Sequence, residues 1–498
     1  MRKFDVIIIG SGLGGLVCGN LLSKEGFSVC ILEKHHTPGG NLQTFMHGGI
    51  KFDTGVHYIG SLGEGQVLNR YWKYLGLTQG LKFKQLDVNG FDIIRFGDTE
   101  FPLAQNPDNF IEQLIPHFPG SRKVLSGYMK KLQHITACSP LYNLEVPGNN
   151  DEEQYRSAGA LGYFNSLGKS FSSDRNLIPL ASVLAGNNFL YAGSEATPLH
   201  MAAMINHSFI SGAYRIIGGS IQIADILSEN ISSKGGVVLP KKEVISIREL
   251  QQKFIAETHD GEMFISTLLI SDIHPQKTFR LMPDSMVRSS TKQRIDNMQN
   301  TPASFILHLG LKPGVFPYFN RNYYIHQNTD VWKNIPAGQP DSMFLLSMSC
   351  SEENQKFTDT ATIMTYDDYS EYFKWESTTV GKRGSDYIEF KNRKAEKLLA
   401  IVRQYFPDLI NAISHTDIST PLTYRDYTGI PEGSLYGIMN DYRNPLLTTV
   451  MPRTKIPNFY FTGQNVNLHG VLGVTIGAVM TCGEILGIDS LLMKIRNG

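Results

Sequence analysis

The sequence predicts an α/β protein in which both ends of the chain contribute to one parallel sheet. Residues 4–9 and 27–32 are short apolar segments that flank a helical segment at residues 13–24. Strand, glycine turn, helix and strand within about 30 residues are typical of the βαβ unit. Residues 458–486 show the same order of strand, glycine turn and helix. Neither N-terminal strand alternates polar and apolar residues, so we expect both faces of the sheet to be buried.

The middle of the chain has a different pattern. Residues 65–210 are predicted to be mostly helical with loops, because aromatic and apolar residues recur at helical spacing between Pro and Gly breaks. Residues 149–156 are polar and charged, which predicts an exposed loop. After residue 213, we expect a Gly-Gly turn and then a helix at residues 220–232.

The second half of the chain is richer in strands. Strands are predicted at residues 237–247 and 254–270, and residues 301–311 and 342–348 alternate like strands of a largely antiparallel sheet. Residues 391–405 form a predicted helix.

A chain of 498 residues exceeds what one hydrophobic core usually serves, so we expect two domains. The first is predicted to combine residues 1–68, 213–275 and 450–498, and the second residues 69–212 and 276–449.

Composition excludes several classes of protein. Basic and acidic residues number 46 each, so no global field attracts nucleic acid. The five cysteines are widely spaced with no CxxC pair, so neither a zinc site nor a disulfide framework is expected. No apolar run reaches about 18 residues, the length of a membrane-spanning helix. The N-terminus does not read as a signal peptide, so we expect a cytoplasmic protein, with peripheral membrane contact left open.

The first turn carries the fingerprint of a dinucleotide-binding site. Gly10, Gly12 and Gly15 have the G-x-G-x-x-G spacing between the first strand and the helix. In this pattern the first glycine allows the tight turn, the second lets a pyrophosphate approach the backbone, and the third lets the helix pack on the sheet. The N–H groups and the partial positive charge of the helix N-terminus then face the phosphates.

The end of the second strand supports this interpretation. Glu33 stands where a carboxylate binds both hydroxyls of an adenosine ribose, and it would repel a 2′-phosphate. NADP is therefore disfavoured at this site.

Two further segments favour FAD over NAD. Thr37-Pro38-Gly39-Gly40-Asn41 follows the second strand, and Phe461-Thr462-Gly463-Gln464-Asn465 leads to a glycine-rich helix start at Gly470. A second helix N-terminus and a double glycine suit a larger cofactor that both chain ends contact.

Together these motifs resemble the phytoene desaturase, carotenoid isomerase and retinol saturase branch of FAD-dependent oxidoreductases. Within it, the chain is most similar to the all-trans-retinol 13,14-reductase (retinol saturase) group. Residues 52–60, Phe-Asp-Thr-Gly-Val-His-Tyr-Ile-Gly, and residues 381–387, Gly-Lys-Arg-Gly-Ser-Asp-Tyr, carry the resemblance, which extends nearly end to end. Asn465 and Asn41 depart from the acidic residue and the arginine common there.

The resemblance implies a glutathione-reductase-like FAD-binding Rossmann fold with a sheet-plus-helix (α+β) substrate domain that encloses a tunnel for polyenes. It also implies the cofactor contacts. The expected FAD-binding residues are Gly10, Gly12, Leu13, Gly14, Gly15, Glu33, Lys34, Gly39, Gly40, Asn41, Val244, Gly463, Gln464 and Val471.

Four residues are candidates for supplying a proton, which net saturation of a C=C bond requires besides a hydride. They are His57, Tyr58, Tyr436 and His469, and an ordinary packing role is the alternative for each. A wider group of aromatic residues either lines an apolar tunnel or belongs to the core: Tyr155, Tyr163, Phe164, Phe171, Phe189 and Tyr191. Asp386 is expected to cap the helix that follows it.

Several functions remain open from the sequence. The enzyme could saturate, desaturate or isomerise a retinoid- or carotenoid-like lipid. An amine oxidase of related fold and a non-catalytic flavin-binding module are the alternatives. The sequence contains no second dinucleotide fingerprint. The electron donor is therefore also open between a separate reductase, a quinone and loosely bound NAD(P)H.

Overall fold

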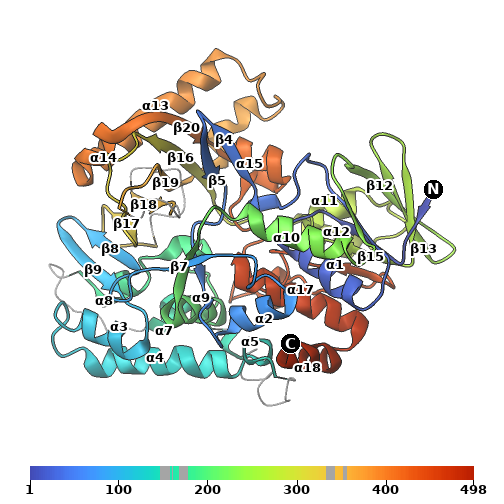
Figure 1. The fold of residues 1–498 in the computed structure, drawn as a ribbon, viewed down its shortest axis with the longest axis horizontal. Coiled ribbons are helices and arrows are strands. Elements are labelled where there is room, and N and C mark those ends of the chain that lie inside the picture. Colours follow the sequence, from blue (N-terminus) through green and yellow to red (C-terminus); the bar gives the residue numbers. More distant parts are fainter. Residues whose placement is uncertain (146–156, 160, 168–177, 333–341, 351–355) are drawn as a thin grey trace.

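Figure 1 shows the fold in the computed structural model, which describes residues 1–145, 157–159, 161–167, 178–332, 342–350 and 356–498. The loop expected at residues 149–156 lies outside the described residues, as do Tyr155 and Phe171.

A five-stranded sheet receives strands from both ends of the chain. Its order is β11 (Val237–Leu239), β3 (Val29–Leu32), β2 (Val6–Ile9), β15 (Leu268–Ser271) and β21 (Phe459–Phe461). All its pairings are parallel. Every residue of β2, β3 and β21 is buried, as their unbroken apolar sequences predict. The carboxyl ends of these strands therefore meet at one edge, where open α/β sheets bind ligands.

Helices cover one face of this sheet. The covering helices α1 (Leu13–Lys24), α10 (Ile221–Ser232) and α17 (Gly470–Leu486) share a core with α2 (Val67–Leu75) and α18 (Ile488–Asn497). Almost every residue of α1 is buried, because the helix packs between the sheet, α10 and α17.

The other face of the parallel sheet carries a small, mainly antiparallel layer. Its strands are β1 (Arg2–Lys3), β14 (Met263–Ser266), β13 (Lys253–Thr258) and β12 (Val244–Leu250), in that order. Helices α11 (Pro275–Arg280) and α12 (Ser289–Asp296) bury Phe279 and Ile295 in the same core. The predicted division placed these two helices in the second domain; the domain boundaries stay a prediction.

A seven-stranded sheet forms the other half of the molecule (Figure 1). Its order is β20 (Ile413–Ser419), β16 (Ala303–Leu311), β19 (Thr360–Asp367), β18 (Met343–Met348), β17 (Asn322–His326), β8 (Asp92–Phe96) and β9 (Thr99–Leu103). Only the β17–β8 pair among these is parallel, which confirms the prediction of a largely antiparallel sheet.

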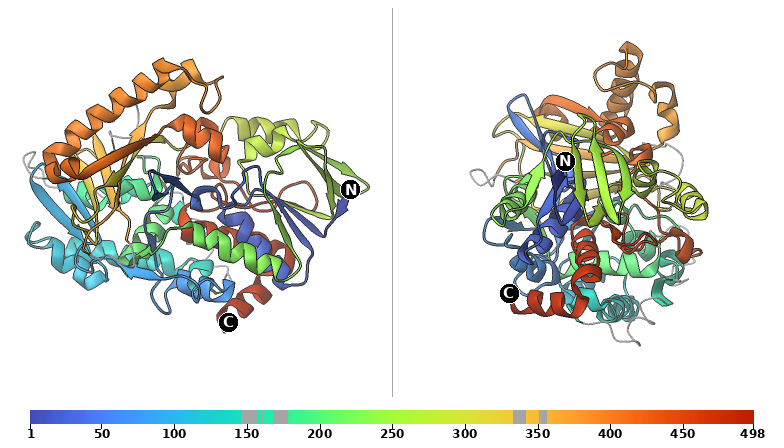
Figure 2. Two further views of the ribbon diagram at one scale, coloured as in Figure 1. Left: turned by 45° about the horizontal axis from the view of Figure 1, so that its top comes forward. Right: turned by 90° about the vertical axis from the view of Figure 1, so that its right-hand side faces the viewer.

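Helices also cover both faces of this sheet. Helices α13 (Ser385–Tyr405) and α14 (Pro407–Ala412) pack on one face, and Figure 2 shows α13 extending along it in orange. The opposite face packs on α3 (Pro107–Leu114), α4 (Arg122–Ala137), α8 (Leu180–Leu184) and α9 (Leu199–Ser211).

Helix α9 joins the two halves. Its residues Met201 and Met204 lie in the core of the parallel sheet, whereas Ala202 and Phe209 lie in the core of the seven-stranded sheet. A helix with apolar residues on more than one side can pack in two cores at once. One helix therefore contributes to the cores of both halves of the molecule.

Short elements fill the remaining connections. Strands β4 (Thr44–His47) and β5 (Ile50–Asp53) form a hairpin, and β6 (Ile59–Gly60), β10 (Ala213–Ile216) and β7 (Phe83–Gln85) form a three-stranded sheet. The short helices are η1 (Gly40–Leu42), α5 (Pro140–Asn143), α7 (Tyr163–Leu167), η2 (Asn188–Tyr191), η3 (Tyr369–Trp375), α15 (Pro421–Thr428), η4 (Pro431–Gly433) and α16 (Pro445–Thr448).

The described part of residues 65–210 is mostly helical, as predicted, but it also contains the unpredicted strands β7, β8 and β9. Strand β8 gains its partners from the distant β17 and the adjacent β9. One expectation about local structure was wrong. Asp386 is not the cap of α13. Gly384 holds that position with φ of 87°, and the Asp386 carboxylate accepts a hydrogen bond from Trp375 Nε1 at 3.1 Å instead.

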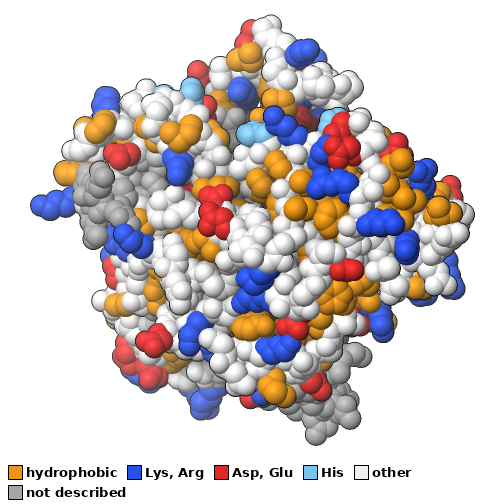
Figure 3. All heavy atoms as spheres, turned by 45° about the vertical axis from the view of Figure 1, so that its right-hand side comes forward, with side chains coloured by type: hydrophobic (Ala, Val, Ile, Leu, Met, Phe, Trp, Pro, Cys, Tyr) orange, Lys and Arg blue, Asp and Glu red, His pale blue; other side chains and the backbone are white. Residues whose placement is uncertain are grey.

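One face of the molecule, drawn in Figure 3, carries a mixture of basic and acidic side chains, in keeping with a net charge of zero. No helix within the described residues is long and apolar enough to cross a membrane. All five cysteines are buried and unbridged.

Candidate functional site

One cavity begins at the carboxyl ends of β2, β3 and β15 and reaches toward the half of the molecule that contains the seven-stranded sheet. At one end it is lined by the glycine turn, Glu33 and Val244. At the other end it is lined by Tyr58, Phe209 and Tyr436. The cavity therefore extends from the edge of the parallel sheet at which the strands end to an apolar interior.

Two helix N-termini meet this cavity without a side-chain cap. Gly12, which has no side chain, precedes α1, and His469, whose side chain makes no capping hydrogen bond, precedes α17. The first N–H groups of a helix have no partner within it, and the helix dipole adds partial positive charge there. Both ends are thus suited to hold the negative groups of a ligand.

The two ends of the chain touch at this point. A Cβ on Gly14 would lie 2.6 Å from Cα of Gly463, a separation that real side chains do not adopt. Any residue larger than glycine at position 14 would push the C-terminal segment away from α1. The close approach sets the width of the cavity between the first helix and the Thr-Gly-Gln segment.

Glu33 organises the glycine turn. One carboxylate oxygen accepts hydrogen bonds from Ser11 N–H at 2.9 Å and Ser11 Oγ–H at 2.6 Å. The other accepts a bond from His35 N–H at 2.9 Å. Since a carboxylate has about four acceptor positions, Glu33 can hold the turn and still accept from ligand hydroxyls.

Asp272 places a second carboxyl group beside the glycine turn, at the end of the cavity that is suited to phosphate groups. A Cβ on Gly12 or Gly14 would lie 2.5 Å from one of its oxygens, so only glycine leaves room for this side chain. Burial raises the pKa of Asp272 to about 8, helped by the nearby Glu33, while the N–H groups of Gly15 and Gly12 act in the opposite direction. At neutral pH the group is therefore mostly uncharged and does not repel a pyrophosphate.

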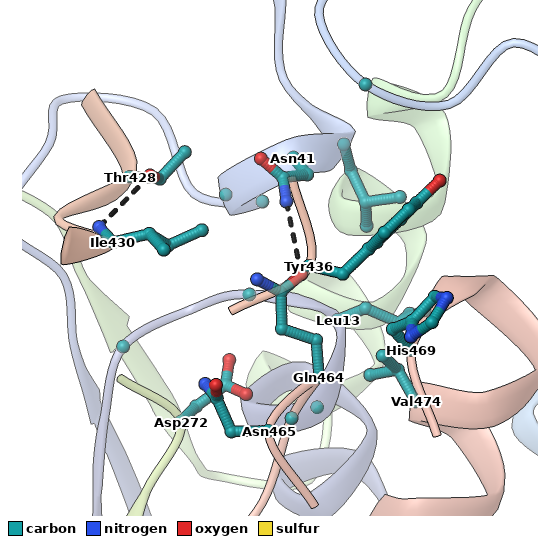
Figure 4. Close-up of a pocket in the computed structure, with 18 of the residues that line it drawn as sticks. Leu13, Asn41, Asp272, Thr428, Ile430, Tyr436, Gln464, Asn465, His469 and Val474 are labelled. Atoms are coloured by element: carbon teal, nitrogen blue, oxygen red, sulfur yellow. Dashed lines mark hydrogen bonds between the residues drawn. The ribbon is translucent and has the colours of Figure 1, made fainter. Parts of the chain in front are cut away.

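These residues fit a dinucleotide cofactor. Two uncapped helix ends, a glycine cradle and a carboxylate at the end of β3 provide for phosphates and a ribose. Asn41 Oδ1, at the cavity wall, is buried without a hydrogen-bond partner among the described residues, and its amide nitrogen donates to Gln464 Oε1 at 3.4 Å (Figure 4).

The apolar end is closed by aromatic rings. Tyr436 stacks on His469 with ring centroids 4.0 Å apart, and Figure 4 shows the two rings side by side at the cavity wall. The Tyr436 hydroxyl donates to the carbonyl of Phe189 at 2.9 Å. Tyr163, Phe189 and Tyr191 are core residues around this end. Nothing is described of the Phe164 side chain.

The structure brings nearly all the expected cofactor residues to this cavity. Its lining includes Gly10, Gly12, Leu13, Gly14, Glu33, Lys34, Gly39, Gly40, Asn41, Val244, Gly463, Gln464 and Val471. Gly15 lies under the turn, where a Cβ would meet the carbonyl oxygen of Gly10 at 2.3 Å. Of the four proton-donor candidates, Tyr58, Tyr436 and His469 line the cavity.

His57 is placed elsewhere. It lines a second cavity together with Arg215, Ser347 and His415. Burial lowers the pKa of both His57 and His469 to about 4. Each imidazole is therefore neutral at pH 7 and is a weak acid.

Tyr58 belongs to a buried polar network that sequence reasoning missed in part. Its hydroxyl donates to Asp92 at 2.9 Å and lies 2.5 Å from the Tyr324 hydroxyl. Asp92 also accepts from Asn322 Nδ2 at 2.9 Å. Burial raises the pKa of Asp92 to about 7, although the hydrogen bonds from Asn322 and Tyr58 work against it.

The sequence did not single out Asp272 or Asp92, for physical reasons. Asp272 directly follows strand β15, and a polar residue at the carboxyl end of a parallel strand is a usable signal. Asp92 has no such signal, because only the pairing of β8 with β17 buries it beside Asn322.

Comparisons with known proteins agree with this arrangement. Residues 8–75 match the model of the NAD(P)-binding Rossmann-like domain. Human all-trans-retinol 13,14-reductase is 27% identical, and the match covers 97% of this chain and 86% of that protein. Prolycopene isomerase 1 from an Oncidium hybrid is 23% identical over 98% of this chain and 85% of that protein.

The chain matches the retinol saturase and carotenoid isomerase family. Among solved structures, putrescine oxidase bound to putrescine superposes with a TM-score of 0.65 at 15% identity, covering 97% of this chain and 99% of that one. The expected glutathione-reductase-like fold with a sheet-plus-helix second half is confirmed.

We expect Asp272 to make the affinity for flavin depend on pH, because its carboxyl group lies beside the glycine turn. Below about pH 8 the carboxyl is protonated, and above it the carboxylate repels the pyrophosphate. We expect the affinity of the apoprotein for FAD to fall up to about tenfold per pH unit above pH 8. Asp272→Asn should remove this dependence. The measurement is a titration of apoprotein with FAD, followed by quenching of flavin fluorescence.

The exposed Asp284→Asn variant is the matched control and should keep the wild-type pH profile. If the affinity for FAD changes with pH in the same way in the wild type and in Asp272→Asn, then Asp272 does not influence cofactor binding.

Proposed function

We propose that this protein is an FAD-dependent oxidoreductase that acts on C=C bonds of a long apolar polyene, retinoid- or carotenoid-like, and saturates one of them. One observation supports this most: a single cavity connects a phosphate-type cradle with an aromatic and aliphatic interior. The full-length relatives whose names refer to retinol reduction and prolycopene isomerisation support the polyene class.

The glycine turn and α1 would hold the pyrophosphate, Glu33 the adenosine ribose, and Gly463 with the α17 N-terminus the remainder of the cofactor. FAD would supply a hydride acceptor or donor beside the substrate carbon. This assignment uses both ends of the chain, which a smaller cofactor would not require.

The substrate half of the cavity excludes water. Met204, Ile205 and Phe209 of α9 face the cavity beside Tyr58 and Tyr436. Burying an apolar chain against such a wall contributes about 25 cal/mol per Å². The wall therefore selects a long hydrocarbon over a polar amine, and amine oxidation is not favoured by the shared fold alone.

Tyr58 is the residue we assign as proton donor for net saturation. Tyr58 lines the cofactor cavity, and its hydroxyl is hydrogen-bonded to Asp92, whose pKa burial raises to about 7. A proton leaving the Tyr58 oxygen can be replaced from protonated Asp92 along this bond. Tyr58 also lines the second cavity, and water in that cavity would resupply the proton.

Isomerisation of a polyene is the second candidate, favoured by the prolycopene isomerase relatives. It needs no net hydride and no proton from Tyr58. For net saturation, the electron donor would be a separate reductase, a quinone or NAD(P)H. A membrane-dissolved substrate would bring the protein into peripheral contact with lipid.

The mass change of the substrate tests the proposed reaction. Protein whose bound flavin has been reduced anaerobically is mixed with all-trans-retinol and with carotenoids. We expect reoxidation of the flavin with a product two hydrogens heavier, detected by liquid chromatography and mass spectrometry. An isomer of unchanged mass would support the second candidate, and absence of any product across the polyenes would contradict both.

Removing the Tyr58 hydroxyl tests the proton route. Tyr58→Phe should slow polyene-dependent reoxidation by about 10²–10⁴-fold, the usual contribution of a positioned acid. In the wild type the rate should fall about tenfold per pH unit above pH 7, because Asp92 loses its proton there. Asp92→Asn should lower the rate and abolish the fall in rate above pH 7. The measurement is stopped-flow flavin absorbance.

Tyr405→Phe, on the outer helix α13, serves as the control and should leave the rate unchanged. Retained FAD in all variants separates a chemical defect from loss of cofactor. Unaltered rates in Tyr58→Phe would exclude Tyr58 as the donor.

A further inference from the structure

Three metal-ligating side chains gather away from the cofactor cavity, where the β4–β5 hairpin reaches strand β20. They are His47, His415 and Asp417, and one ligand atom of each lies within 4.8 Å of the other two. None of them belongs to the residues assigned above to the cofactor or the proton route.

The fold brings these residues together from distant parts of the chain. His47 is the last residue of β4 and lies 370 positions from Asp417 in sequence. His415 and Asp417 are two residues apart on β20, an edge strand, so their side chains share one face. His47 Nδ1 contacts the Asp417 carboxylate, and its ring meets that of His415 at a centroid distance of 5.3 Å.

The hydrogen bonds of Ser414 fix the state of the His415 ring. The Ser414 hydroxyl donates its single proton to the carbonyl of Gly310 at 2.9 Å. Its oxygen lies 3.2 Å from His415 Nδ1 and must therefore accept from Nδ1–H. The lone pair of His415 is then on Nε2, which is buried without a hydrogen-bond partner among the described residues. A second-shell bond of this kind orients histidine ligands of metals.

Two glycines make space for this ring. A Cβ on Gly310 would lie 2.1 Å from His415 Cε1, and one on Gly48 would lie 3.1 Å from the same atom. Phe52 packs its edge against the ring at 5.8 Å between centroids. The imidazole is thus held in place before any ligand arrives, which lowers the entropy cost of binding.

We propose that His47, His415 and Asp417 bind a divalent transition-metal ion of the Zn²⁺ type, with water in the fourth position. Two imidazoles and one carboxylate suit Zn²⁺, whereas Mg²⁺ and Ca²⁺ prefer oxygen ligands. The cysteine spacing gave no sign of this site, because its ligands are His and Asp from separate segments.

The ion would join the hairpin to the substrate half of the molecule. The His47 side chain is 56% exposed and that of Asp417 28%, so an ion can enter from solvent. The ammonium group of Lys391, on α13, interacts electrostatically with Asp417 and would compete with a metal ion for this carboxylate. Strand β5 is followed by the segment that contains His57 and Tyr58. A metal ion bound by the three side chains would therefore hold the start of that segment in place.

Metal binding to the tag-free, full-length protein tests the proposal. Zn²⁺ is titrated calorimetrically, and bound metal is counted by mass spectrometry after dialysis. We expect one Zn²⁺ per chain, no comparable binding of Mg²⁺, and a higher thermal midpoint that EDTA reverses. His47→Ala and Asp417→Asn should each weaken Zn²⁺ binding by about tenfold or more.

The exposed His259→Ala variant is the matched control and should bind Zn²⁺ as the wild type does. Because His47 is largely exposed, its replacement should leave the metal-free thermal midpoint unchanged. Equal Zn²⁺ binding by His47→Ala, Asp417→Asn and His259→Ala would overturn the proposal and leave an ordinary His–Asp ion pair.

Discussion

The close contact of Gly14 with Gly463 is the constraint on which the rest of the structure depends. It lets the first helix and the C-terminal segment lie against each other, so that two helix N-termini face one cavity. Neither N-cap residue caps its helix, although the buried Asp272 carboxyl accepts hydrogen bonds from the N–H groups of Gly12 and Gly15 at the start of α1. The other N–H groups at these two helix starts need water or an anionic ligand as a partner. The arrangement therefore suits an elongated ligand with negative groups.

The second half of the molecule adds an apolar extension to that cradle. Helix α9 packs in both hydrophobic cores and presents Met204, Ile205 and Phe209 to the cavity. Tyr58 lines the same cavity, and its hydroxyl donates to Asp92 within a buried polar network. In the proposed reaction, the apolar wall would exclude water and the Tyr58–Asp92 pair would supply the proton, while the other end of the cavity would hold the cofactor.

Much of this arrangement could be predicted because its signals are local. Helix α1 begins at Leu13 and ends at Lys24 as expected, since glycine turns flank a mostly apolar segment. The cavity residues around Glu33 and Gly463 follow from short motifs. What could not be predicted depends on distant pairing: strands β8 and β9 are short, and β9 contains Pro102. Burial of Asp92 likewise depends on Asn322, 230 positions away. The tautomer of His415 depends on its neighbour Ser414, whose own hydrogen bond to Gly310 spans 104 positions.

The identity of the ligand released by the purified protein tests the central claim most directly. The protein is denatured, and the supernatant is analysed by chromatography and mass spectrometry, with visible absorbance recorded beforehand. The structure predicts a yellow protein that releases one FAD per chain. A colourless protein that takes up no flavin from excess FAD, while folded by circular dichroism, would contradict the account.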